Sequence, residues 1–234
     1  MNQSTETSQH LIQLLLDAGV RHIVVAPGSR SAGLAWAAAR AEQAGCCRLH
    51  VRIDEREAGY LALGLAKAQR EPVAVIVTSG TAAVNLLPAF VEAHYAAVPV
   101  VAITADRPAA LRGHGAPQTI DQVSAFLPYA AASVDAASGS VDWATVSAAL
   151  AASTAQRRQP VHLNLQFEPP LLPEDTQWQP QPPVVPVRRT IEAVRPSLAL
   201  PQRGLVVAGD IADPSDAADV ANFAEQAGWP IILE

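Results

Sequence analysis

Short apolar segments alternate with longer helical segments along most of the chain. The apolar segments include HIVVA, PVAVIV, PVVAIT and PVHLNLQF, and the helical ones include AGLAWAAARAEQAG and EREAGYLALGLAKAQR. Apolar residues recur at helical spacing in the longer segments, whereas the short segments are apolar throughout. Strands of this kind, alternating with helices, are typical of a parallel sheet that helices cover on both faces. We therefore predict an α/β fold built on a doubly wound parallel sheet.

The chain changes character at a proline-rich stretch. Residues 169–203 hold nine of the 19 prolines, a composition typical of an extended linker between domains. GLVVAGD, PSDAADVANFAEQAG and PIILE then begin a second α/β unit. We expect a first domain over residues 1–168, a linker over 169–203 and the beginning of a second, central α/β domain over 204–234. We also expect the complete protein to continue past Glu234.

Composition excludes several classes of protein. Hydrophobic residues make up 50% of the chain and charged residues 16%, so a substantial core is expected and disorder is not. A formal net charge of −6 gives no electrostatic basis for binding nucleic acid or an anionic membrane surface. No apolar run is long enough to span a membrane, and the polar N-terminus does not resemble a secretory signal. The adjacent Cys46 and Cys47 read as reduced thiols, so we expect a cytoplasmic protein.

Four polar loops come directly after predicted strands, where parallel sheets bind their ligands. They read PGSRS, DERE, TSGT and ADRP. Glycine allows the first and third loops to turn sharply and to approach a ligand closely. Arg30 and Arg107 suit carboxylates, because a guanidinium can bind a carboxylate through two hydrogen bonds.

Each loop also has a purely structural interpretation. Ser31, and either Ser79 or Thr81, would cap the helices that follow their loops. The acids of DERE would complement the dipole at the start of the next helix. Arg107 would pair with Asp106, its neighbour in the chain. On the residues alone, these alternatives remain open.

Taken in order, the loops and the segments between them resemble one family closely. The run from APGSRS through RIDEREAGY, VTSGTAAVN and ITADRP to GAPQTIDQ is similar to the N-terminal pyrimidine-binding domain of the 2-succinyl-5-enolpyruvyl-6-hydroxy-3-cyclohexene-1-carboxylate synthases (MenD). The resemblance covers about residues 5–168. It implies a transferase of menaquinone biosynthesis that uses thiamine diphosphate to decarboxylate 2-oxoglutarate. The succinyl carbanion equivalent is then added to isochorismate, which gives the compound for which the family is named.

The resemblance implies a catalytic role for Glu55. In the family, the glutamate of D-E-R hydrogen-bonds N1′ of the cofactor's aminopyrimidine and exchanges a proton with it, which lets the cofactor form its reactive carbanion. A carboxyl at the end of a strand, at the mouth of an apolar interface, suits this task because desolvation allows it to hold or release a proton near neutral pH. Asp54 is then expected to be a helix cap or another structural acid.

Other site positions follow from the same resemblance. We expect contacts with the cofactor from Pro27, Glu55, Thr78, Ser79, Gly80 and Thr81. We expect the carboxylates of substrate and intermediate to bind at Ser29, Arg30, Arg107 and Gln118. The chain departs from the family at Pro117, where the family usually has asparagine. Proline removes an amide donor and fixes φ at that point.

The family binds the cofactor's diphosphate and its Mg²⁺ or Mn²⁺ in a C-terminal domain, so no metal site is expected in this chain. Gly209-Asp210 lacks the second glycine of the family's metal motif. We expect this chain to be inactive alone, and the complete protein to be a homodimer or homotetramer with active sites between subunits. Two alternatives are the pyrimidine-binding part of another thiamine diphosphate 2-oxoacid decarboxylase or carboligase, and a non-catalytic α/β binding module.

Overall fold

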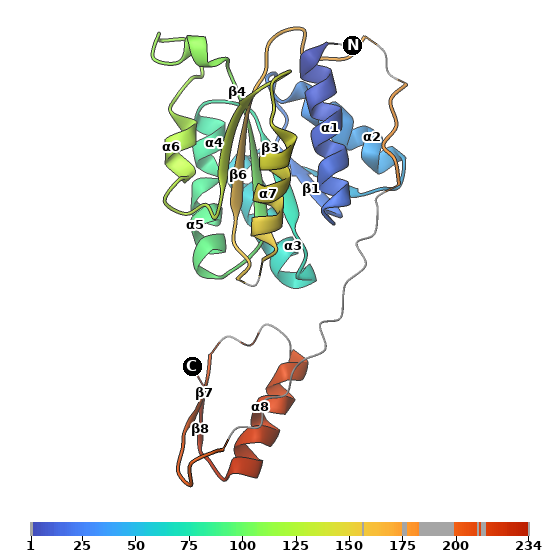
Figure 1. The fold of residues 1–234 in the computed structure, drawn as a ribbon. Helices are drawn as coiled ribbons and strands as arrows, with labels where there is room; N and C mark the ends of the chain where they lie inside the picture. The colour runs from blue at the N-terminus through green and yellow to red at the C-terminus, as the bar shows by residue number, and fades with distance from the viewer. Residues whose placement is uncertain are drawn as a thin grey trace. The chain divides into compact units, whose positions relative to one another are not determined.

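The computed structural model describes residues 2–155, 157–174, 177–182, 199–209, 211 and 214–233. The chain divides into two compact units, Met1–Val187 and Arg188–Glu234. The first unit contains a six-stranded sheet with the strand order β2-β1-β3-β4-β6-β5, in which all neighbouring strands are parallel (Figure 1). This sheet confirms the predicted doubly wound α/β fold.

Most elements of the first unit lie where the sequence predicts them. The strands are β1 (His22–Val25), β2 (Arg48–Val51), β3 (Val73–Val77), β4 (Val100–Asp106), β5 (Ser133–Ala137) and β6 (Val161–Gln166). The helices are α1 (Gln3–Asp17), α2 (Ala32–Gln43), α3 (Glu55–Gln69), α4 (Thr81–Asn85), α5 (Leu87–Tyr95), α6 (Gln122–Phe126) and α7 (Trp143–Ser153). A short 3-10 turn spans Ala109–Leu111.

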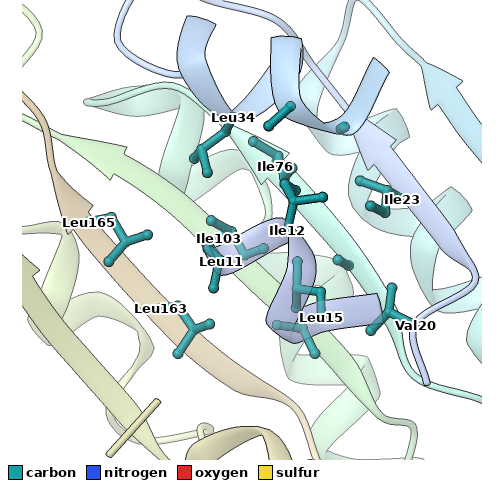
Figure 2. Close-up of a cluster of buried hydrophobic side chains, with 14 of the residues drawn as sticks. Leu11, Ile12, Leu15, Val20, Ile23, Leu34, Ile76, Ile103, Leu163 and Leu165 are labelled. Atoms are coloured by element: carbon teal, nitrogen blue, oxygen red, sulfur yellow. The ribbon is translucent and has the colours of Figure 1, made fainter. Parts of the chain in front are cut away.

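Helices cover both faces of the sheet. On one face, α1, α2 and α7 pack over a cluster of buried aliphatic side chains that includes Leu11, Leu34, Ile76, Ile103 and Leu163 (Figure 2). On the other face, α3, α5 and α6 pack over a second cluster that includes Val24, Val75, Phe90 and Phe126. Burial of each large apolar side chain contributes about 1.5–3 kcal/mol, so both faces of the sheet stabilise the fold.

β6 does not match the expectation that the strands are apolar throughout. All 6 of its residues are buried, but polar and apolar side chains alternate along it. The leucines join the first cluster, whereas the polar side chains of His162, Asn164 and Gln166 point to the opposite face. An unsatisfied buried polar group costs about 1–3 kcal/mol. His162 and Asn164 avoid this cost through hydrogen bonds with β4, β5 and α6.

The sequence does not predict β5 and α6. β5 reads SVDAA, an edge strand with little apolar character, and α6 has only 5 residues. The segment AAVNLLPAFVEAHYA forms two helices, α4 and α5, with Pro88 in the first turn of α5. Proline lacks the N–H that an uninterrupted helix would use there, so the helix ends and restarts.

The second unit contains β7 (Val206–Ala208), α8 (Pro214–Ala227) and β8 (Ile231–Leu233). Its two strands pair in parallel. These are the elements that the sequence predicts after the proline-rich stretch. Among the described residues of the chain, no helix has the length and apolar character needed to cross a membrane.

Within the first unit, the beginning of the proline-rich stretch packs against α1 and α2. The ring of Trp178 lies 6.0 Å from the ring of Trp36, and the backbone N–H of Gln181 donates to Gln13 Oε1 over 2.8 Å. Residues 183–198 of the expected linker lie outside the described residues. The domain boundaries proposed from the sequence therefore stay a prediction.

Candidate active site

The sheet has a switch point between β1 and β3. The connection from β1 to β2 runs through α2 on one face, and the connection from β2 to β3 runs through α3 on the other face (Figure 1). Open α/β sheets bind ligands outside the carboxyl ends of the strands at such a point. The loops that follow β1 and β3, residues 27–31 and 78–81, leave the sheet there.

The two loops touch at Gly28 and Thr78. A Cβ atom added to Gly28 would lie 2.5 Å from Thr78 Cβ, so this contact requires glycine. Ser31 closes the first loop, because its Oγ accepts from Gly28 N–H and lies equally close to Gly28 O, at 3.2 Å in each case. Ser31 occupies the N-cap position of α2, but its side chain makes no capping hydrogen bond with the described backbone, so the capping interpretation is wrong. Pro27 and Ser29 are exposed.

The loop 78–81 is buried over most of its length. Thr78 and Ser79 are buried, whereas Thr81 is exposed. Gly80 is the N-cap of α4 and has a φ of 77°, a conformation that favours glycine. Among the described residues no side chain caps α4, so the interpretation of Ser79 or Thr81 as a cap is also wrong.

Gln118 closes over this loop. Its Nε2 donates to Ser79 O over 2.9 Å, and a Cβ added to Gly80 would lie 2.7 Å from Gln118 Cγ. Gln118 has a φ of 55° and follows Pro117 directly. The structure thus brings Gln118, expected to bind substrate, against the loop expected to contact the cofactor.

Arg107 lies near enough to Arg30 to affect its ionisation. Arg30 is half-buried and donates from Nη1 to Phe167 O over 2.8 Å. Desolvation lowers the pKa of Arg30 and the charge of Arg107 lowers it further, while Asp106 and Glu168 act in the opposite direction. No carboxylate of the described chain lies within salt-bridge distance of either guanidinium. Two neighbouring cations without such a partner favour an anionic ligand.

The alternative in which Arg107 pairs with Asp106 is wrong. The Nε of Arg107 donates to Pro117 O over 2.7 Å, and only its backbone N–H donates to Asp106 Oδ1, also over 2.7 Å. The Asp106 carboxylate pairs instead with Arg112 at 2.6 Å. The contact with Pro117 ties Arg107 to the same segment that carries Gln118.

Glu55 begins α3, just after the carboxyl end of β2. Asp54 caps this helix, because its Oδ1 accepts from Glu57 N–H over 2.9 Å, and the capping role expected for Asp54 is confirmed. Glu57 pairs with Arg52 at 2.8 Å. Glu55 is half-buried, and no other described residue hydrogen-bonds or pairs with its carboxyl. Ile53, two residues earlier, is 95% exposed and places an apolar surface near this end of α3.

Comparison with known proteins establishes the family. Residues 5–125, about half of the chain, match the family described as "Thiamine pyrophosphate enzyme, N-terminal TPP binding domain". The chain belongs to the thiamine pyrophosphate enzymes. The match includes the loops 27–31 and 78–81, Glu55, Arg107 and Gln118.

Three relatives are each named 2-succinyl-5-enolpyruvyl-6-hydroxy-3-cyclohexene-1-carboxylate synthase. The protein of Kineococcus radiotolerans is 47% identical over 245 residues, covering 100% of this chain and 44% of the relative. The protein of Nocardioides sp. is 47% identical over 232 residues (99% and 40%), and that of Paenarthrobacter aurescens is 46% identical over 235 residues (95% and 40%). These similarities confirm the resemblance seen in the loops. The chain spans less than half the length of each of these relatives.

The described residues of this thiamine pyrophosphate enzyme fit the cofactor's aminopyrimidine ring. The Glu55 carboxyl has no described partner and can bind a ring nitrogen. The glycines of loops 27–31 and 78–81 let the backbone pack directly against Thr78 and Gln118 at this end of the sheet. In the described part of the chain, no group of three or more His, Cys, Asp and Glu side chains is arranged to hold a metal ion.

Sequence reasoning missed a set of buried polar residues next to these loops in the thiamine pyrophosphate enzyme. Gln122 accepts a hydrogen bond from Gly80 N–H over 3.0 Å, and its own amide donates to Asn164 Oδ1 over 2.6 Å. Asn164 lies on β6 and reaches Asp135 on the edge strand β5. The sequence did carry a signal for the members of this set on β6, since HLNLQ alternates polar and apolar side chains.

Proposed function

We propose that the complete protein decarboxylates 2-oxoglutarate and transfers the succinyl unit to isochorismate, which gives 2-succinyl-5-enolpyruvyl-6-hydroxy-3-cyclohexene-1-carboxylate in menaquinone biosynthesis. The observation that carries the proposal is the similarity, over at least 95% of this chain, to three relatives named for that synthase. The described loops support it through their cations and through the unpaired carboxyl of Glu55.

Glu55 is the proposed catalytic residue. Thiamine diphosphate, when bound, supplies the nucleophilic carbon that attacks the 2-oxoacid and stabilises the charge left by loss of carbon dioxide. The Glu55 carboxyl would hydrogen-bond N1′ of the aminopyrimidine and exchange a proton with it. The carboxyl lies in the first turn of α3, and its lack of a described partner leaves it free for this bond.

The two arginines would bind the substrates. Both 2-oxoglutarate and isochorismate carry two carboxylates, and Arg30 and Arg107 lie near one another without a described carboxylate partner. A guanidinium binds a carboxylate through two parallel hydrogen bonds, so each arginine can orient one acidic group. Ser29, which is exposed in the same loop as Arg30, and Gln118 would complete the substrate contacts.

The loops around the switch point would hold the pyrimidine ring. Pro27 would contact the ring from the loop after β1, and the loop after β3 would contribute the remaining contacts through Thr78, Ser79, Gly80 and Thr81. The close packing of these loops supports the proposal, because Gly28 packs against Thr78 and Gln118 packs against Gly80. Binding of a ring between loops that are already packed costs less conformational entropy than binding that must first order the loops.

The proposed enzyme is a homodimer or homotetramer in the cytoplasm. A C-terminal domain of another subunit would bind the diphosphate and its Mg²⁺ or Mn²⁺ and would cover Glu55, so this chain alone is expected to be inactive. The exposed apolar side chains of Val51, Ile53 and Tyr60 lie close in sequence to Glu55 and support an interface there. Domain boundaries at residues 168 and 203 belong to the same proposal.

The test is the consumption of isochorismate by the full-length protein with 2-oxoglutarate, thiamine diphosphate and Mg²⁺. The Glu55→Gln variant keeps the shape of the side chain but cannot exchange a proton, and its rate should fall by about 10²–10⁴-fold. Glu71→Gln is the matched control, because Glu71 is exposed and lies before β3, at the opposite end of the sheet from the loops. Its rate should equal that of the wild type.

Two outcomes would contradict the proposal. A wild-type protein that binds thiamine diphosphate but leaves isochorismate unchanged would exclude this synthase reaction and direct the search to other 2-oxoacids. A folded Glu55→Gln variant with the rate of the Glu71→Gln control would exclude the role of Glu55.

A further inference from the structure

A connected group of polar side chains lies between β4, β5, β6 and α6, beside the loops of the proposed site. Most of them are fully buried, and none is among the residues that the family resemblance assigns to cofactor or substrate contacts. The group consists of Thr104, Asp106, Arg112, Gln122, Asp135, His162, Asn164 and Gln166. We call it the polar cluster.

The charges of the polar cluster lie on two carboxylates and one guanidinium. Arg112 donates from Nη2 to Asp106 Oδ2 over 2.6 Å and to Asp135 Oδ1 over 2.9 Å, and from Nη1 to Asp135 Oδ2 over 2.7 Å. Asp106 has 0% exposure. With two negative charges and one positive charge, the cluster is net negative by one unit.

These carboxylates fix the orientation of the amide of Asn164. A carboxylate only accepts hydrogen bonds, so Asn164 Nδ2 must be the atom that donates to Asp106 Oδ2 over 3.0 Å and to Asp135 Oδ1 over 2.7 Å. Asn164 Oδ1 then faces Gln122. The amide of Asn164 therefore has one orientation that satisfies all of its partners.

Asn164 in turn fixes the orientation of Gln122. Gln122 Nε2 must donate to Asn164 Oδ1 over 2.6 Å and to the backbone Ala105 O over 3.1 Å, since both of these atoms only accept. This leaves Gln122 Oε1 as the acceptor for Gly80 N–H at 3.0 Å. The orientation set by two carboxylates is thus passed to a backbone amide of the loop 78–81.

The hydrogen bonds of His162 are consistent with these orientations of the Asn164 and Gln122 amides. Thr104 Oγ1 donates to Asn164 Oδ1 over 2.7 Å, so it must accept from His162 Nε2 over 2.8 Å. Ser133 Oγ lies 3.3 Å from His162 Nδ1 and can donate to it. Burial lowers the pKa of His162 to about 3, so the ring is neutral and carries its proton on Nε2.

The same cluster holds the segment that faces the loop 78–81. Arg112 lies between Arg107 and Gln118 in the sequence and binds Asp106 and Asp135, while Gln118 packs against Gly80. The polar cluster therefore holds both sides of the proposed site, the loop 78–81 and the segment 107–118.

We propose that Gln122 is a positioning residue, which holds the Gly80 amide and hence the loop 78–81 in the conformation that binds the cofactor. The proposal rests on the proposed function, because it assumes that this loop contacts thiamine diphosphate. Without the Gln122 acceptor, the buried Gly80 N–H has no described partner, and the glycine is free to adopt other conformations.

The first experiment measures the dissociation constant of thiamine diphosphate for full-length Gln122→Met, with Mg²⁺ and without substrate. Methionine fills a similar volume but cannot accept the Gly80 N–H, so we expect the dissociation constant to rise at least about tenfold. Circular dichroism establishes whether the variant is folded. A folded variant whose dissociation constant lies within twofold of the wild-type value would overturn the proposal.

The second experiment uses Gln122→Glu and a pH series. When ionised, the new carboxylate places an acceptor against two other acceptors, Ala105 O and Asn164 Oδ1. It also lies beside the negative charges of Asp106 and Asp135, which Arg112 only partly neutralises. When protonated, it regains a donor. Desolvation and these charges raise the pKa of such a carboxyl, so the dissociation constant should approach the wild-type value as pH falls from about 9 to 6. His162 stays neutral over this range.

Gln69→Glu is the matched control for the added charge, because Gln69 is exposed at the end of α3. Its dissociation constant should follow that of the wild type at every pH. If Gln122→Met does not fold, the pH series tests the proposal. A ratio of the Gln122→Glu dissociation constant to the wild-type one that stays the same from about pH 9 to pH 6 would overturn it. The binding experiments contain no substrate, so they test the positioning role separately from the reaction. A wild-type protein that binds the cofactor but leaves isochorismate unchanged in the activity assay would contradict only the proposed reaction. A wild-type protein that does not bind the cofactor defeats the positioning role as well.

Discussion

Gly28 lies so close to Thr78 that the loops after β1 and β3 are in direct contact. The Cβ that alanine would add at Gly28 falls 2.5 Å from both Cβ and Cγ2 of Thr78. These atoms are attached close to the backbone, so relief of the overlap requires one of the two loops to move. The contact therefore determines the separation of the loops at the switch point.

Gly28→Ala is expected to destabilise the protein by about 1–3 kcal/mol and to weaken thiamine diphosphate binding, because the two loops must separate. Gly64→Ala is the matched control. Apart from the local helix backbone and the two neighbouring residues, nothing lies within 4 Å of a Cβ added there, and Gly64 is in α3, where alanine is favoured by up to about 1 kcal/mol. Thermal unfolding with and without the cofactor measures both effects. Equal melting temperatures for the two variants would show that the Gly28 contact is not restrictive.

Arg107→Ala is expected to raise the KM for the anionic substrates about 10–100-fold in the full-length enzyme. It removes charge-assisted hydrogen bonds, each of which contributes about 1.5–3 kcal/mol. Arg157→Ala, at an exposed position, should leave KM unchanged. Steady-state kinetics with each substrate varied in turn measures the effect. An Arg107→Ala enzyme with wild-type KM values for both substrates would remove Arg107 from the site.

Arg112→Lys is expected to lower the free energy of unfolding by about 2 kcal/mol. Lysine keeps the charge but cannot reproduce the fork that binds Asp106 and Asp135 together, so a buried carboxylate loses part of its hydrogen bonding. Arg48→Lys, at an exposed position, should change the stability by less than about 0.5 kcal/mol. Urea denaturation gives both values, and an equally small loss in the two variants would contradict this account of the fork.

His162 predicts a pH dependence of stability. Burial lowers its pKa to about 3 in the folded protein, against about 6.5 in an unfolded chain. The stabilising contribution is complete above the unfolded pKa and is lost as pH falls, because only the unfolded chain then takes up the proton. Between about pH 7 and pH 5 the loss from this group is about 2 kcal/mol. Urea denaturation of His162→Gln at both pH values should show a smaller loss than the wild type, by about that amount.

His114→Gln is the control for the histidine experiment. His114 is exposed in the segment between β4 and α6, so its replacement should leave the pH dependence of stability as it is in the wild type. If His162→Gln and His114→Gln lose the same stability between the two pH values, the buried ring does not account for the effect.

Sequence reasoning succeeded where one local rule decides the structure. The strand Val73–Val77 is wholly apolar and wholly buried, as expected in a sheet covered on both faces. The helix Glu55–Gln69 begins where Asp54 offers a capping carboxylate to Glu57 N–H. The predicted positions of the polar loops after the strands follow from the alternation of such elements.

Sequence reasoning failed where the deciding partner is remote. β6 carries Asn164 in a buried strand only because Asp106, Gln122 and Asp135 satisfy its amide. No local pattern identifies those partners. Ser31 was a reasonable helix cap in local terms, but its hydroxyl binds Gly28 instead because the loop after β1 folds back at that point.

The parallel pairing of the strands has a consequence for folding kinetics. His22 pairs with Val73 and Val101 with Val161, so each contact closes a long loop of chain. Such closures cost conformational entropy before any contact is gained, and chains dominated by them fold slowly. The chain between β1 and β3 contains α2, β2 and α3, so we expect the loops of the proposed site to meet late in folding. A ligand of that site should therefore slow unfolding while leaving the rate of folding nearly unchanged.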